Sequence, residues 1–268
     1  MNTTQMEERK IKLTFGYQGT AYYGFQRQNN GPSIQAEIEK VLKHILRHET
    51  KIVASGRTDS GVHAREQVAH FVTTSRIPAD RLVPAMNTFL PDDIVVLHAV
   101  DVPMDFHARY DVTEKTYKYR ILNQDTPDPF IRDWAYHVKA PLDIEKMRAA
   151  AAYFLGTHDF TSFCSMRTQV EDKVRTIYEV TIEVTQRDKF VPGQGLDIWL
   201  TFRGNGFLYN MVRMMTGALV EVGKGRWEVD YVKWMLEAKN GTIAKANVPP
   251  QGLYLWKVEY RKSTPPGV

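Results

Sequence analysis

Residues 55–67, SGRTDSGVHAREQ, gather side chains that could do chemistry in one short loop. Asp59 stands between Gly56 and Gly61, with Arg57 before it and His63 after it. An ionised carboxylate beside a cation can act as a nucleophile or a general base. The same carboxylate can instead accept nearby backbone N–H bonds in an Asx-turn, and local spacing alone favours that turn.

Metal chemistry has one weak candidate, the pair His44 and His48 on a predicted helix. A zincin helix places Glu directly after its first His as the general base, whereas Ile45 follows here. No third ligand accompanies the pair, so we interpret both histidines as helix residues on the solvent side and expect no metal.

Cofactor and thiol chemistry are not indicated either. The G-x-G at Gly204 lacks the third glycine and the later acidic residue of a dinucleotide site, and no phosphate-binding GxxxxGK[ST] is present. Cys164 is the one cysteine, so no intrachain disulfide can form and a reducing compartment is expected.

The bulk composition describes a globular chain. It has 268 residues, 43% of them hydrophobic, and a net charge of +4 that leans mildly toward polyanionic partners. No run approaches the roughly 18 apolar residues of a membrane helix, and the N-terminus lacks an apolar signal core. We expect a cytoplasmic protein that does not enter a membrane.

Hydrophobic periodicity then predicts the elements that position the loop. Alternation places Ile11, Leu13 and Phe15 on one face of a first strand, and Ser33 begins an amphipathic helix. Further strands are expected around 52–54, 66–74, 93–102, 114–123, 175–184, 196–204 and 252–260. Further helices are expected around 79–90 (interrupted or begun at Pro84), from Asp143 to Gly156, over 207–223, and over 230–241 with Gly241 closing it.

Many neighbouring strands are spaced as hairpins rather than as parallel β-α-β units. The pattern predicts an α+β fold with a mainly antiparallel sheet, in two similar halves that meet near residues 105–115. Asp59 falls in a loop between two strands, which is a rigid mount for a reactive side chain.

The loop motif GRTDSGVHA closely resembles the signature of the tRNA pseudouridine synthase A family. Other segments resemble the family in the same order, so that the resemblance runs from about Lys10 to Tyr260. These segments are GYQGTAYYGFQRQ, NTFLPDDIVV, DFHARYDVTEKTYKYRI, HDFTSF, RTIYEV, FRGNGFLYNMVRMMTGALVEVGKG and PPQGLYLWKVEY.

The resemblance implies a pseudouridine synthase fold, with two α/β halves whose sheets join across a central basic cleft. Residues 1–107 would form the half with the aspartate loop, and residues 108–268 the half with an active-site tyrosine and arginine. It also implies a homodimer that isomerises uridine to pseudouridine at positions 38, 39 and 40 of the tRNA anticodon stem-loop, without metal or cofactor.

Residue roles follow from the same resemblance. Asp59 matches the essential aspartate, Arg213 its basic partner, and Tyr117 the tyrosine that can stack on a flipped-out uracil. Arg57 is expected to contact phosphate or fill the gap left by the flipped base, and His63 to shape the loop. Ser60 stands where the family usually has alanine, a small-for-small change that leaves the assignment intact.

Periodicity by itself does not distinguish Tyr117 from Tyr119, which shares its strand face, and either could be a core aromatic. Two rival functions also stay open on the residues: a silent RNA-binding protein on this scaffold, and a carboxylate hydrolase with Glu66 as its second acid. Wider RNA contacts are expected among Tyr22, Tyr23, Phe25, Arg27, Arg65, Lys115, Lys118 and Arg167.

Overall fold

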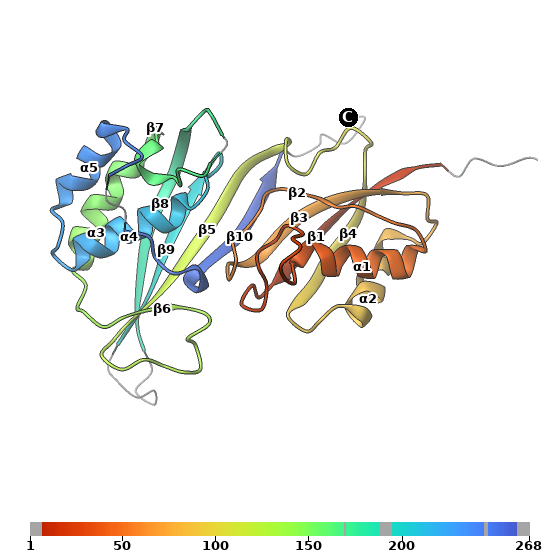
Figure 1. Ribbon diagram of the computed structural model, residues 1–268, viewed down its shortest axis with the longest axis horizontal. Coiled ribbons are helices and arrows are strands. Elements are labelled where there is room, and N and C mark those ends of the chain that lie inside the picture. The colour runs from red at the N-terminus through yellow and green to blue at the C-terminus, as the bar shows by residue number, and fades with distance from the viewer. Residues whose placement is uncertain (1–6, 169, 188–194, 244–245, 262–268) are drawn as a thin grey trace, which may run out of the picture. The chain divides into compact units, whose positions relative to one another are not determined.

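The computed structural model describes residues 7–168, 170–187, 195–243 and 246–261. The chain packs as two compact units (Figure 1). Unit 1 comprises residues 1–113 and 255–268, and unit 2 comprises residues 114–254. The expected functional division into 1–107 and 108–268 stays a prediction, as does the cleft between the halves.

Unit 1 is a sheet with two helices. Its strands run in the order β4-β1-β3-β10, and β2 pairs with β3. The elements are β1 (Arg9–Tyr17), α1 (Ile34–Leu46), β2 (Val53–Ala54), β3 (His63–Thr73), α2 (Ala79–Phe89), β4 (Ile94–Val102) and β10 (Leu253–Tyr260). The pairings of β1 with β3 and with β4 are antiparallel, as the sequence predicts.

Strand β1 and helix α1 show why these residues adopt these elements. Ile11, Leu13 and Phe15 are all fully buried, which confirms the predicted inward face of the first strand. Ser33 accepts a hydrogen bond from the Ala36 N–H and caps the first turn of α1, as expected for a Ser at this position.

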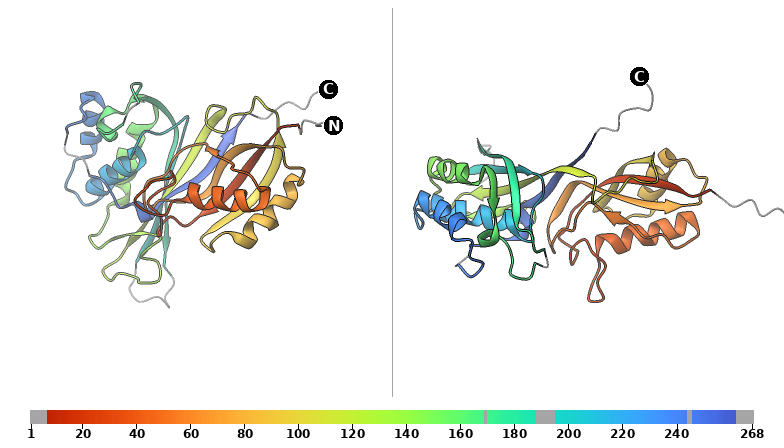
Figure 2. Two further views of the ribbon diagram at one scale, coloured as in Figure 1. Left: turned by 45° about the vertical axis from the view of Figure 1, so that its right-hand side comes forward. Right: turned by 90° about the horizontal axis from the view of Figure 1, so that it is seen from above.

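Unit 2 contains strands in the order β5-β9-β8-β7, and β6 pairs with β5. Helices α3, α4 and α5 gather on this sheet, as Figures 1 and 2 show. The elements are β5 (Val112–Asn123), β6 (Tyr136–Val138), α3 (Ile144–Ala151), β7 (Gly156–Asp159), β8 (Val174–Gln186), β9 (Leu196–Gly204), α4 (Met211–Gly223) and α5 (Val229–Ala238), with 3-10 turns at Ala152–Phe154, Thr161–Phe163 and Pro250–Gly252. Pairings β5–β9, β8–β9 and β7–β8 are antiparallel, and β5–β6 is parallel.

Four helix boundaries differ from the sequence expectation. Helix α4 begins at Met211, after the left-handed Asn210, rather than at residue 207. Helix α2 begins at Ala79 and runs through Pro84 without a break, since tertiary packing of the helix outweighs the one backbone donor that proline lacks. Helix α3 is capped by Asp143 as predicted but ends at Ala151, because a 3-10 turn follows and Gly156 already begins β7. Helix α5 ends in a left-handed Lys239 rather than at Gly241.

Candidate functional site

The Asp59 loop connects β2 to β3 in unit 1. A tight turn closes it, in which the Val62 N–H donates to the Asp59 carbonyl oxygen at 3.1 Å and Gly61 has a left-handed φ of 77°. Asp59 is half-buried and Arg57 is exposed. The loop therefore presents a carboxylate and a guanidinium two residues apart, on a backbone that is itself hydrogen-bonded.

A second loop, residues 18–32, packs against the first by close backbone approach. A Cβ on Gly19 would lie 2.0 Å from the Val62 carbonyl oxygen, and Gly24, at φ +96°, would carry a Cβ 3.0 Å from the Thr58 carbonyl. The same Thr58 carbonyl accepts the Phe25 N–H at 3.1 Å. Only glycine allows this contact, which explains the glycines of the GYQGTAYYGF segment.

Side chains reinforce that packing from both loops. His63 is buried, and its Nδ1 accepts the Gly19 N–H at 3.0 Å. The Ser60 hydroxyl donates to the Tyr22 carbonyl at 3.1 Å. The geometry gives His63 a structural function in the loop, in agreement with the sequence expectation, and a serine at position 60 serves the packing directly.

A buried polar cluster below the loop was not found by sequence reasoning. The Tyr17 hydroxyl lies 2.7 Å from Thr58 Oγ1, and the Ser55 hydroxyl donates to Gln67 Oε1 at 2.7 Å. Gln67 Nε2 in turn donates to the Gly56 carbonyl at 3.0 Å. The one sequence feature that could have indicated this cluster is Gln67, a polar residue at an inward position of β3. Gln67 is fully buried, and a buried amide needs hydrogen-bond partners.

In unit 2, the strand β5 separates the two tyrosines that periodicity could not. Tyr119 is fully buried, its hydroxyl donates to the Pro249 carbonyl at 2.7 Å, and its burial holds its pKa well above the usual value. Tyr117 is half-buried and its ring meets Phe207 edge to face at 5.1 Å. Tyr119 is therefore a core residue, whereas Tyr117 keeps accessible ring surface.

Arg213 lies in the first turn of α4. Its Nε donates to the Val248 carbonyl at 2.8 Å and its Nη1 to Asn210 Oδ1 at 2.9 Å. A cation in the first helical turn opposes the helix dipole, so these acceptors offset part of an unfavourable placement. The half-buried guanidinium, together with the helix N-terminus, forms a region that favours an anion.

The other residues expected to contact RNA differ in how much of their side chains is exposed to solvent. Tyr22 and Phe25 are 5% and 3% exposed, which places them in the core of unit 1 and removes them from that set. Tyr23 is 51% exposed, and Arg65 lies over the Trp256 ring at 5.2 Å. Over the part of the chain described, no three His, Cys, Asp or Glu side chains are grouped so as to hold a metal ion.

The sequence that forms both units matches a known protein family. The family model described as tRNA pseudouridine synthase matches residues 14–111 and 150–261, which include Asp59 and Arg213 and leave Tyr117 between the two matched ranges. The chain belongs to the tRNA pseudouridine synthase family. It is an isomerase that converts uridine in tRNA to pseudouridine.

Individual relatives agree over nearly the full length. Proteins named tRNA pseudouridine synthase A share 50% identity over 254 residues in Exiguobacterium sp. strain AT1b and 47% over 253 residues in Bacillus pumilus. These alignments cover 95% and 94% of this chain and 99% of each relative. The protein of the same name from Halalkalibacterium halodurans is 44% identical, with 97% of this chain and 98% of the relative covered.

Within the residues that the structure describes, no helix has the length and apolar character needed to cross a membrane.

Proposed function

We propose that this chain isomerises the uridines at positions 38, 39 and 40 of the tRNA anticodon stem-loop, with Asp59 as the essential carboxylate. The observation that carries the proposal is the Asp59 loop. Thr58, Ser60 and His63 are all committed to hydrogen bonds that hold the backbone, while the half-buried Asp59 carboxylate is carried on the tight turn. A carboxylate pre-positioned in this way suits attack on a fixed substrate.

The reaction exchanges one glycosidic bond for another. The bond from N1 to C1′ breaks, the uracil rotates, C5 joins C1′, and the C5 proton is lost while N1 gains one. Asp59 either attacks C1′ or removes the C2′ proton to give a glycal-like intermediate, and both routes need its ionised form near the ribose.

Arg213 is the proposed cationic partner of the Asp59 carboxylate. The support lies within unit 2, where a guanidinium in the first turn of α4 creates a region that favours an anion. A paired carboxylate keeps a low pKa and stays ionised at neutral pH.

Tyr117 and Arg57 are proposed to bind the substrate. The ring surface of Tyr117 can stack on an extruded uracil, and its edge-to-face contact with Phe207 fixes the ring for that purpose. Arg57 is exposed beside Asp59, where a guanidinium can bind an RNA phosphate or fill the space that the uracil leaves.

We also propose a cytoplasmic homodimer. Strand β4 lies at one edge of the unit 1 sheet and exposes Val95, Leu97 and Val100, each between 41% and 44%. Exposed apolar side chains on an edge strand are a feature that a second copy can cover. Replacing Leu97 by lysine should shift the sedimentation coefficient to that of a monomer, and a monomeric wild type would contradict the dimer.

The central test uses tRNA transcribed with tritium at uracil C5. Pseudouridine formation releases that tritium to water. Asp59→Asn keeps the shape of the side chain and removes its charge, so it should abolish release while tRNA still binds. Full activity of Asp59→Asn would remove Asp59 from the chemistry, and release of free uracil would indicate a hydrolase.

The modified positions need a separate measurement. Pseudouridine can be mapped by carbodiimide labelling and primer extension on tRNAs with uridine at only one of the positions 38, 39 and 40. All three single-uridine tRNAs should be modified, and uridines outside the anticodon stem-loop should not. Modification elsewhere would contradict the proposed positions while leaving the isomerase activity in place.

A further inference from the structure

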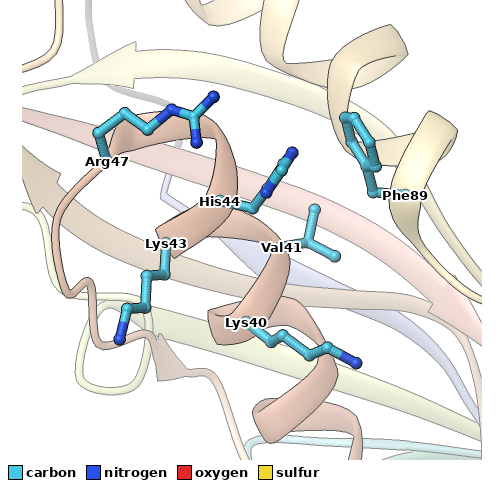
Figure 3. Close-up of a pocket in the computed structure, with 6 residues that line it drawn as sticks. All are labelled: Lys40, Val41, Lys43, His44, Arg47 and Phe89. Atoms are coloured by element: carbon cyan, nitrogen blue, oxygen red, sulfur yellow. The ribbon is translucent and has the colours of Figure 1, made fainter.

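A basic hollow lies between helices α1 and α2 of unit 1, away from the Asp59 loop. It is an open hollow on the surface, with a volume of about 580 Å³. Figure 3 shows the residues that line it: Lys40, Val41, Lys43, His44, Arg47 and Phe89. We refer to these six residues as the α1–α2 groove.

Helix electrostatics explains part of this surface. Cations in the last turn of a helix are favoured by the dipole, and Lys43 lies there. Lys43 also pairs with Glu49 and extends away from Phe89 (Figure 3). Lys40 lies 3.6 Å from Glu37, and both partners of this weak pair reach solvent.

Arg47 stands at the same end of α1, where the helix dipole also favours a cation, but it lacks the ion pair that Lys40 and Lys43 each have within the described residues. It follows the last turn of α1 with a left-handed φ of 64°, a conformation that glycine adopts at much lower cost. Its guanidinium is exposed and makes no ion pair or hydrogen bond with the residues described. The left-handed backbone is accounted for by the helix end, where the Arg47 N–H donates to the Lys43 carbonyl. The exposed guanidinium at the rim of the hollow is the part of Arg47 that can bind an anion.

Phe89 adds an apolar surface beside the cations. Its ring is 54% exposed and lies 4.5 Å from the His44 ring, centroid to centroid. Cations that flank an exposed aromatic ring are the combination that RNA recognition uses, with phosphates on the cations and a sugar or base face on the ring. The α1–α2 groove carries this combination on one small surface.

We propose that the α1–α2 groove binds the sugar-phosphate backbone of the substrate tRNA, with phosphates on Arg47 and Lys40 and a ribose or base face on Phe89. Helix α1 begins at the 18–32 loop, where the Ile34 N–H donates to the Gly24 carbonyl, and the Phe25 N–H of that loop donates to the Thr58 carbonyl in the Asp59 loop. At about 1.5 Å per residue, the groove extends from about 9 Å (Lys40) to about 20 Å (Arg47) from that end. In this proposal one tRNA makes two contacts with unit 1: its uridine reaches the Asp59 loop and its backbone binds the α1–α2 groove.

Arg47→Gly separates binding from folding. Glycine suits the left-handed φ, so this variant should melt at the same temperature as the wild type or higher, while its affinity for tRNA falls roughly threefold. The double variant Lys40→Ala/Arg47→Gly should bind roughly tenfold more weakly, and the slope of log Kd against log salt should fall by about 1 to 2. Phe89→Ala should weaken binding with no change in that slope.

Lys146→Ala is the matched control, since Lys146 is an exposed helix lysine flanked by Asp143 and Glu145 and should leave Kd unchanged. Filter binding of the full tRNA transcript from about 50 to 200 mM salt gives Kd and slope. Unchanged affinity in the double variant overturns the proposal, as does an equal loss in Lys146→Ala. An altered oligomeric state with unchanged tRNA affinity also overturns it and assigns the groove to a protein partner.

The binding result depends on tRNA as the substrate and not on the modified positions. Failure of the mapping at positions 38, 39 and 40 would therefore contradict the proposed function and leave the α1–α2 groove standing.

Discussion

Replacing Tyr17 by phenylalanine tests whether the buried cluster below the loop positions Asp59. The Tyr17 hydroxyl lies 2.7 Å from Thr58 Oγ1, in the residue directly before Asp59, and 3.5 Å from Gln67 Nε2. Phenylalanine keeps the ring in its place between Phe15 and Phe25 and removes only the hydroxyl. The change therefore acts on the hydrogen bond to the loop and leaves the aromatic packing intact.

Two magnitudes follow from this geometry. Loss of the short hydrogen bond to Thr58 and the longer one from Gln67, with the Thr58 hydroxyl left unsatisfied, should lower the free energy of unfolding by about 1–3 kcal/mol. The effect on rate is a positional one, and a displacement of about 1 Å at a catalytic group can cost on the order of a hundredfold. Because backbone contacts also hold the turn, we expect kcat to fall about tenfold to a hundredfold.

The rate effect should not depend on pH across the neutral range. Burial raises the pKa of Tyr17 to about 12, with the hydrogen bonds from Thr58 and Gln67 lowering it less. The wild-type hydroxyl therefore stays protonated from about pH 6 to pH 9, and its hydrogen bond is present throughout. The ratio of wild-type to Tyr17→Phe activity should be constant over that range.

Tyr260→Phe provides a matched control. Tyr260 is also in unit 1 and its hydroxyl donates to the Ala108 carbonyl at 2.7 Å, so the same atom is removed without touching the Asp59 loop. Tritium release under saturating tRNA gives kcat, and urea unfolding gives stability. If Tyr17→Phe is as active as the wild type, or if Tyr260→Phe loses as much activity, the reasoning about loop positioning is refuted.

Two further predictions concern unit 1. Gly19→Ala would place a Cβ 2.0 Å from the Val62 carbonyl oxygen, so we expect a loss of about 1–3 kcal/mol in urea unfolding together with reduced tritium release, and an unchanged variant would contradict the close approach. His70 has its pKa lowered to about 4, mainly by burial and next by the charge of Lys10. Since unfolded histidine binds its proton near pH 6.5, the His70 contribution to stability is present above that pH and is lost as pH falls toward 4. His70→Asn keeps an acceptor for the Ala108 N–H but does not titrate. Its melting temperature should therefore fall less than that of the wild type between pH 6.5 and pH 4. An equal fall in both proteins would show that His70 does not cause the loss of stability.

Much of the secondary structure was predictable from local patterns. Strand faces with strict alternation, such as Ile11, Leu13 and Phe15, bury one side of a sheet, and the capping residues Ser33 and Asp143 mark helix starts through their own hydrogen bonds. Helix ends were predicted less well. Pro84 does not break α2, because contacts with the strand beside it decide the outcome and they are not encoded locally.

For the site, the sequence by itself determined the family, through ordered motifs that include Asp59, and it predicted which residues take part in the chemistry. Alternation by itself left Tyr117 and Tyr119 indistinguishable, since it puts both on one strand face, and the family resemblance alone favoured Tyr117. Only the tertiary structure decided that Tyr119 is a core residue, because the Pro249 carbonyl and Gly252, distant in sequence, close over its ring. The same holds for Tyr17 and Thr58, 41 positions apart, whose contact exists only once β1 packs below the Asp59 loop.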